Sequence, residues 1–235
     1  MGGTSKRMRA AHAAVDRKKA YPLREAVEIL KGTPPVKFDE AVEISVTLEI
    51  DPKRTDQAVR GMVVLPHGTG KTRRVIVFAK GDEAKAAEAT CADVVGGDDL
   101  IQRVAGGWLD FEVAVATPDL MKDLARLGKL LGPRGLMPSP KAGTVTMDVA
   151  RAVKEMKGGK VEFKMDRQGD VHLACGRRSF PVEHLLGNIQ AFLEALWRAR
   201  PASVKGVYVK AVTLSTTMGP GVKLDILKVR EAVAA

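Results

Sequence analysis

The sequence has few cysteines and no long apolar run. Two cysteines, Cys91 and Cys175, lie far apart in 235 residues and outside any Cys-x-x-Cys motif, which disfavours a disulfide framework and a zinc knuckle. We expect two reduced thiols, at least one of them buried. No uncharged stretch approaches the ~20 residues that a membrane helix needs, and the first 20 residues lack the apolar run of a secretory signal. We therefore expect a soluble cytoplasmic protein.

Aromatic residues are also scarce, at 4% of the chain. This is too few for the stacking platform that single-strand binders use. Basic residues, in contrast, are in excess: 38 Lys and Arg against 28 Asp and Glu give a net charge of +10. A basic protein with few aromatic rings is typical of one that holds a polyanion by phosphate contacts and shape.

The charge excess lies mainly at the two ends of the chain. Residues 1–68 carry a net charge of +3, residues 69–158 of +2, and residues 159–235 of +5. The simplest explanation is that the two ends fold together and that the middle is an insertion. We therefore predict one discontinuous domain from residues 1–68 and 159–235, and an inserted domain from residues 69–158.

The two parts differ in their expected secondary structure. In the middle, apolar strands over residues 74–79, 92–95 and 111–116 alternate with helices over 82–90, from 98 onward, and 117–131. This order predicts a parallel sheet covered on both faces. The ends predict an antiparallel α+β layer, with helices after Pro22 and over 182–197, strands over 40–50, 207–214 and 222–226, and a hairpin of 160–164 with 170–174.

Enzyme motifs are absent or incomplete. The segment His67–Thr72 (HGTGKT) is similar to a phosphate-binding loop, but Leu65 stands where that loop needs glycine, and a strand is expected where it needs a helix. The turns of the middle part place carboxylates in the first helical turn, where they repel anions. The four histidines share no ligand spacing. We therefore predict no catalytic residue, metal or cofactor; a nucleotide-dependent enzyme acting through the middle part remains the alternative.

Three segments rich in glycine, proline or hydroxyls are candidates for binding. Residues 131–145 (LGPRGLMPSPKAGTV) contain Arg134 and Lys141 and no acid, and the alternative here is a solvated basic connector. Residues 215–221 (STTMGPG) offer hydroxyls and backbone amides to sugar and phosphate oxygens, or form a simple hairpin loop. Residues 37–40 (KFDE) precede a strand, and Phe38 either packs in the core or faces a base.

Several segments together resemble a known family. They are VKFDEAVE (36–43), DPKRTDQAVR (51–60), VLPHGTGK (64–71), ATPD (116–119), LLGPRGLMPSPKAGTV (130–145), GRRSF (176–180) and TTMGP (216–220). In this order they resemble the L-one family of bacterial large-subunit ribosomal proteins, the proteins of the mobile stalk. The resemblance implies a discontinuous α+β domain with an inserted Rossmann-like, three-layer α/β domain.

The resemblance also implies partners and contact residues. The family binds the stalk region of large-subunit rRNA, moves with deacylated tRNA that leaves the exit site, and represses its own operon mRNA. The implied RNA-binding residues are Lys37, Phe38, Arg54, Arg167, Arg177, Ser179, Thr216, Thr217, Met218 and Gly219. The resemblance further implies that Arg134 and Lys141 belong to a loop on the side that meets tRNA. Two departures are Arg177, where the family commonly has Lys, and Cys175, where it has Val; the first preserves charge but not geometry. A generic basic RNA chaperone remains the other alternative.

Overall fold

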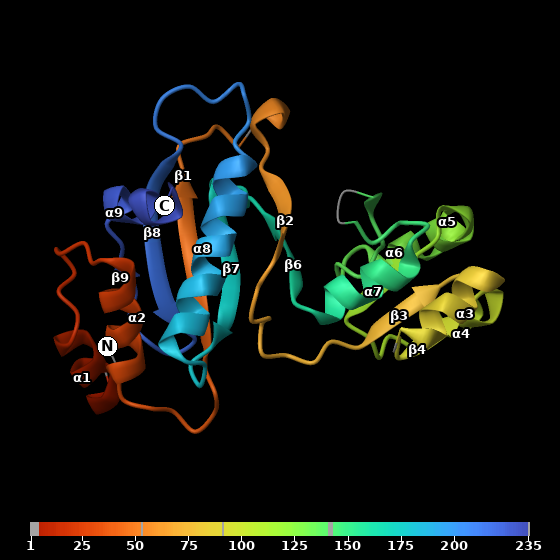
Figure 1. Ribbon diagram of the computed structural model, residues 1–235, viewed down its shortest axis with the longest axis horizontal. Helices are drawn as coiled ribbons and strands as arrows, with labels where there is room; N and C mark the ends of the chain where they lie inside the picture. The colour runs from red at the N-terminus through yellow and green to blue at the C-terminus, as the bar shows by residue number, and fades with distance from the viewer. Residues whose placement is uncertain (1–4, 53, 91, 141–142, 235) are drawn as a thin grey trace. The chain divides into compact units, whose positions relative to one another are not determined.

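The computed structural model describes residues 5–52, 54–90, 92–140 and 143–234. The chain divides into two compact units: unit 1 comprises Met1–Gly70 with Val161–Ala235, and unit 2 comprises Lys71–Lys160. Unit 1 contains an antiparallel sheet and unit 2 a parallel one (Figure 1). The expected mixture of α/β and antiparallel α+β structure is therefore confirmed. In the described part of the chain, no helix has the length and apolar character needed to cross a membrane.

The sheet of unit 1 has four strands in the order β7-β1-β8-β9. These are β7 (Asp170–Arg177), β1 (Ala41–Leu48), β8 (Val209–Thr216) and β9 (Val222–Lys223). In the central strand β1, every second side chain from Val42 to Leu48 is buried, and the residues between them are more accessible. This period of two matches the alternation in the sequence and places one face of the sheet against the core.

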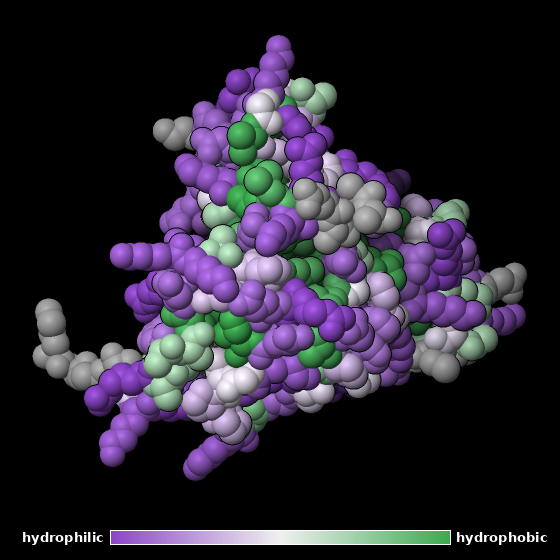
Figure 2. Space-filling view, turned by 60° about the vertical axis from the view of Figure 1, so that its left-hand side comes forward, coloured by the Kyte–Doolittle hydropathy of each residue, from purple (hydrophilic) through white to green (hydrophobic). Residues whose placement is uncertain are grey.

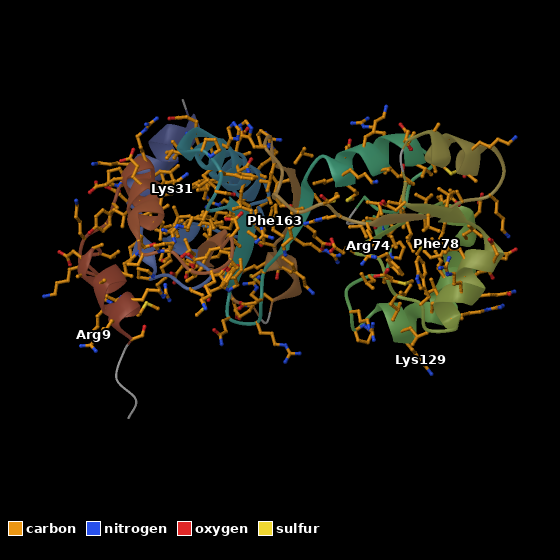
Figure 3. All side chains as sticks on the ribbon, turned by 90° about the horizontal axis from the view of Figure 1, so that it is seen from below. Arg9, Lys31, Arg74, Phe78, Lys129 and Phe163 are labelled. Carbon is orange, nitrogen blue, oxygen red and sulfur yellow. The ribbon has the colours of Figure 1, made fainter. Side chains whose placement is uncertain are left out.

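The long helix α8 (Val182–Arg198) covers the buried face of this sheet (Figure 1). Its apolar stripe includes Leu185, Ile189, Phe192 and Leu196, all fully buried. Phe192 meets Phe163 edge-on, with ring centroids 5.5 Å apart, and Phe163 lies inside unit 1 in Figure 3. Unit 1 also contains the helices α1 (Lys6–Ala13), α2 (Leu23–Gly32) and α9 (Ile226–Ala234).

One of the two cysteines is placed by the structure. Cys175 lies on β7 and is fully buried in the core of unit 1. Burial raises the pKa of its thiol far above the usual range, because the thiolate would lose its hydration. Cys175 is therefore a buried, protonated thiol, as expected for at least one of the pair. Cys91 lies outside the described residues.

The expected hairpin of residues 160–164 and 170–174 is wrong in its pairing. Both strands exist, as β6 (Lys160–Lys164) and β7, but β6 pairs with β2 (Arg60–Val64) in a separate two-stranded sheet. Only an isolated bridge joins Met165 to Val171. Beyond this bridge β6 leaves the free edge of β7 and takes β2 as its partner, whereas β7 pairs with β1 on its other edge. A short 3₁₀ turn, η1 (Thr55–Gln57), precedes β2.

Unit 2 is built around three parallel strands in the order β4-β3-β5. These are β4 (Val94–Gly96), β3 (Val75–Phe78) and β5 (Val113–Ala116). The four residues of β3 are all buried and alternate between two apolar clusters, with Phe78 in one of them (Figure 3). The helix α7 (Val149–Lys157), which the sequence analysis did not predict, packs with α3 (Asp82–Ala89) on one face; α4 (Asp98–Ala105) lies on the other. The predicted cover on both faces is confirmed.

The helix expected over residues 117–131 is instead a series of short turns. It consists of η2 (Pro118–Leu120), α5 (Met121–Leu124), η3 (Ala125–Leu127) and α6 (Gly128–Leu131). Thr117 precedes it but is buried, and its side chain caps no amide. The four leucines that end these turns are all buried. Alternating 3₁₀ and α turns keep them on one side, and Gly128 weakens a continuous helix.

Candidate nucleic-acid interface

Eight of the ten residues expected to bind rRNA meet at one end of the sheet of unit 1. At this end β1 begins and the neighbouring strands β7 and β8 finish (Figure 1). Ala41 is opposite Arg177 on one side, and Val42 is opposite Thr216 on the other. Three connecting segments therefore converge here: residues 33–40, 178–181 and 217–221. We call this end of the sheet the loop end.

A buried carboxylate lies at the centre of the loop end. Glu40 is 1% exposed, and its Oε1 accepts hydrogen bonds from Thr216 Oγ1 at 3.1 Å and from the backbone amide of Met218 at 2.9 Å. Its Oε2 pairs with Arg178 Nη1 at 2.9 Å. Buried charges are tolerated where they are paired and hydrogen-bonded. The carboxylate thus joins the start of β1 to the turn that follows β7 and to the loop that follows β8.

Arg178 extends this network to the end of α2. Its guanidinium also donates to the backbone carbonyls of Lys31, at 2.9 Å, and of Thr33. In return, the ammonium of Lys31 donates to the carbonyl of Phe180. The planar guanidinium can serve several acceptors at once, which an ammonium could not do in the same geometry. Carbonyls at the C-terminal end of α2 are thereby satisfied by a side chain from the turn after β7.

The loop after β8 is fixed by its own backbone as well. Thr217 pairs with Ala41 through its amide, which donates to the Ala41 carbonyl at 3.1 Å, and through its Oγ1, which accepts from the Ala41 amide at 3.0 Å. Gly219 donates to the Thr216 carbonyl at 3.0 Å. A Cβ at Gly219 would lie 2.2 Å from Thr216 Oγ1, so only glycine fits this close turn. Met218 is left with 47% of its surface exposed.

The segment before β1 is held by Asp39. The Asp39 carboxylate accepts from the amide of Ser179 at 3.1 Å and from its hydroxyl at 2.7 Å. Arg177 Nη1 donates to the Asp39 carbonyl at 2.9 Å. Phe38, one residue earlier, is 53% exposed, and Lys37 is exposed beside it. Phe38 is therefore outside the core, and the first of its two alternatives is wrong.

The structure separates the expected residues by their accessibility. Lys37, Phe38, Ser179, Thr217 and Met218 are exposed at the loop end. Thr216, in contrast, is 3% exposed and its hydroxyl is committed to Glu40. Thr216 therefore positions the loop and does not present a side chain to a ligand.

Arg54 and Arg167 lie at the opposite end of the sheet. Arg167 belongs to the turn before Asp170, which is opposite Thr47 near the end of β1. Arg54 follows β1 and pairs with Asp56 at 3.0 Å. At ~3.4 Å per residue, the length of β1 separates the two ends by roughly 20 Å or more. Arg54 and Arg167 are thus separated from the eight expected residues that meet at the loop end.

The tRNA-side candidates belong to unit 2. Arg134 is exposed in the segment that follows α6. Lys141 lies outside the described residues. The structure therefore places one of the two cations and shows that it is accessible.

Sequence reasoning missed the side chains that organise the loop end, namely Asp39, Glu40 and Arg178. A signal was present, because two acids in sequence precede β1 in a segment otherwise free of them, and Arg178 is part of the GRRSF segment. The sequence does not show, however, that residues 138 positions apart form an ion pair.

One group of described side chains has the composition of a metal site. Asp166, Asp170 and His172 each bring a ligand atom within 4.8 Å of the others. The Asp166 carboxylate accepts from the backbone amides of Gln168 at 2.8 Å and Asp170 at 2.9 Å, and these bonds hold its pKa below the usual range. The carboxylate is thus accounted for as the organiser of the turn before β7.

Comparison with known proteins identifies the family of this chain. The model of the ribosomal protein L1p/L10e family matches residues 29–220, a span that contains all of unit 2 and the loop end up to residue 220. The chain belongs to this family. The chain is also similar to a curated member of the ribosomal protein L1 family, the large ribosomal subunit protein uL1 of Protochlamydia amoebophila (strain UWE25). It is 55% identical over 226 residues, which cover 96% of each chain.

Membership of the ribosomal protein L1 family confirms three expectations. The chain is a ribosomal protein, it is a cytoplasmic protein, and it is not an enzyme. The element that follows the HGTGKT segment is the strand β3, as the sequence predicted. The amides of a helix N-terminus, which a phosphate-binding loop requires, are not provided there.

Proposed function

We propose that the loop end of unit 1 binds large-subunit rRNA at the mobile stalk. The main observation that supports this proposal is the exposure of two large apolar side chains. Phe38 and Met218 remain about half exposed on loops that a buried network holds in place. Contact groups on a rigid support lose little conformational entropy when they bind. Loops fixed in this way are suited to a folded partner of defined shape.

The polar groups of the loop end match the backbone of folded RNA. Lys37 and Arg177 supply positive charge, and the Thr217 hydroxyl and the backbone around Gly219 can meet phosphate and 2′-hydroxyl oxygens. A-form RNA is recognised largely by such contacts and by shape. Arg54 and Arg167, at the other end of the sheet, would engage a second stretch of the same RNA. Such backbone contacts agree with the low aromatic content.

Two further partners belong to this proposal. An operon mRNA that folds like the rRNA site would compete for the loop end, so that excess protein represses its own synthesis. Exit-site tRNA would be met by unit 2, through the exposed Arg134 and through Lys141. Both polyanions suit the net charge of +10. We propose no cofactor.

Replacing Met218 by alanine tests the loop end directly. We expect affinity for the rRNA stalk to fall about tenfold, equivalent to ~1.4 kcal/mol, because an exposed apolar contact is removed. Thermal stability should stay within about 0.5 kcal/mol, as for other exposed side chains. Filter-binding titration and thermal unfolding measure the two quantities, with an unrelated RNA of equal length as control. Unchanged affinity, or equal affinity for both RNAs, would contradict the proposal.

A shortened chain tests the proposed division of labour. We propose that residues 1–68 and 159–235 form one RNA-binding domain and that residues 69–158 form a Rossmann-like insertion; the division into two compact units supports this. A fragment that joins 1–68 to 159–235 by a short linker should retain most of the rRNA affinity in the same titration. The isolated 69–158 fragment should show none, and the reverse result would refute the division.

A further inference from the structure

The N-terminal arm, residues 5–19, is a second basic surface in unit 1. It contains six Lys and Arg residues and a single acid, Asp16. The Asp16 carboxylate accepts from the Lys18 amide at 2.9 Å and so stabilises a turn within the arm. Figure 2 shows hydrophilic side chains projecting from the part of the molecule that carries α1, and Arg9 marks this helix in Figure 3. The positive charge is therefore concentrated on one short segment.

The arm is anchored, so its cations have defined positions. Ala11 and Val15 are buried, at 0% and 7% exposure. The Asp16 amide donates to the Tyr21 hydroxyl at 2.9 Å, and the Tyr21 amide donates to the Lys223 carbonyl at 2.9 Å. These bonds connect the arm to β9, the strand that follows the Met218 loop. The arm is part of the folded unit and presents its charges from a fixed support.

A pocket lies between the arm and the strands next to the Met218 loop. It has a volume of ≈ 280 Å³, and its polar lining consists of His12, Arg17, Thr213 and Lys223. Its other lining residues are Val15, Pro220 and Gly221, so no carboxylate contributes to it. Arg17 Nη2 lies 3.4 Å from both ring nitrogens of His12. Among the described side chains, no carboxylate forms an ion pair with Arg17 or Lys223. Cations and a hydroxyl that converge in this way favour an anion.

The pocket is continuous with the loop end. Pro220 and Gly221, which line it, follow Met218 by two and three residues. Arg7 Nη2 donates to the Met218 carbonyl at 2.8 Å, so the arm also contacts the loop itself. A nucleic acid held at Met218 would carry its backbone past the mouth of the pocket.

We propose that the pocket formed by His12, Arg17, Thr213 and Lys223 seats a backbone phosphate of the bound RNA. The arm thereby extends the loop end along the RNA strand. This inference rests on the proposed function, because the RNA is the source of the phosphate. Arg17 and Lys223 provide the charge, and Thr213 provides a hydroxyl donor.

The test is the salt dependence of rRNA binding by the full chain. Removing a phosphate contact lowers the slope of log affinity against log salt by about one. The double variant Arg17→Ala/Lys223→Ala removes both cations that hold this phosphate, so it should lose about one from the slope and about tenfold or more in affinity at moderate salt. The charge-matched control Arg198→Ala/Lys228→Ala removes two exposed cations from α8 and α9 and should change affinity less than about twofold. All four positions are exposed or partly exposed, so thermal unfolding should be unaffected.

Ethylation interference identifies the RNA phosphate that the pocket binds. In the wild-type complex, ethylation of the phosphate that the pocket binds should block binding, and this position should lose its effect in the Arg17→Ala/Lys223→Ala variant. An unchanged interference pattern, or equal loss of affinity in the variant and its charge-matched control, would overturn the inference. Failure of the proposed function is distinguishable, because then Met218→Ala would also leave affinity unchanged.

Discussion

Replacing Glu40 by alanine is expected to destabilise unit 1 by about 3–5 kcal/mol, the usual cost of removing one partner from a buried ion pair. Arg178, with 15% of its side chain exposed, would keep its charge without the carboxylate. The Thr216 hydroxyl and the Met218 amide would lose their shared acceptor. The variant should therefore also lose RNA affinity, and more than Met218→Ala does, because the whole loop loses its support.

The two tryptophans allow this loss to be measured in unit 1 alone. Trp197 belongs to unit 1 and Trp108 to unit 2, so a Trp108→Phe background reports urea unfolding of unit 1 through Trp197 fluorescence. Glu194→Ala is the matched control, since its pair with Arg198 is exposed and such pairs contribute ~0–1 kcal/mol. A Glu40→Ala protein as stable as this control would show that the network does not support the loop end.

A second large effect is expected at Asn188, a fully buried residue of α8. Its Oδ1 accepts from the His67 amide at 3.0 Å, and its Nδ2 donates to the carbonyls of Gly68 at 2.8 Å and Cys175 at 2.7 Å. Asn188→Ala would leave these backbone groups without partners. The bond to the Cys175 carbonyl is buried and the other two are partly buried, and a buried orphan costs about 1–3 kcal/mol. We expect a loss of about 3 kcal/mol in the stability of unit 1.

Hydrogen exchange locates this second effect. The His67 amide should exchange much faster in Asn188→Ala, whereas amides at the centre of β1 should change only by the global loss of stability. Gln190→Ala, two residues further along α8 and only partly buried, serves as the control. Protection of the His67 amide equal to that in the wild type would refute the role assigned to Asn188.

The elements that the sequence predicted well are those with a local pattern. The alternation in β1 and the apolar stripe of α8 each fix which face is buried, without knowledge of a partner. The pairing of β6 was predicted wrongly, because neighbours in sequence suggest a hairpin and nothing local reveals that β2, distant in the sequence, is the partner of β6. The helix predicted over residues 117–131 was wrong for a similar reason, because the spacing of its leucines fits both a continuous helix and a broken one.

At the loop end, the sequence indicated the segments but not the roles within them. Thr216 and Thr217 are adjacent and chemically alike, yet one is buried against Glu40 and the other is exposed. Only the register with β1 decides between them. Arg167 and Arg177 belong to one turn and strand, but the extended chain carries them to opposite ends of the sheet. Residues that are few positions apart in the sequence can lie far apart in space. An extended strand separates them the most, because its rise per residue is large.

The network around Glu40 has a consequence for the order of events during synthesis. Its bonds join residues 40 and 178 and residues 40 and 218, which are 138 and 178 positions apart. A growing chain therefore exposes Lys37 and Phe38 long before the carboxylate beside them has any partner. Contacts of such long range are slow to form, because a long loop must first be closed. The loop end thus exists only in a finished molecule, and an incomplete chain still held by the ribosome that makes it has no assembled loop end to bind RNA.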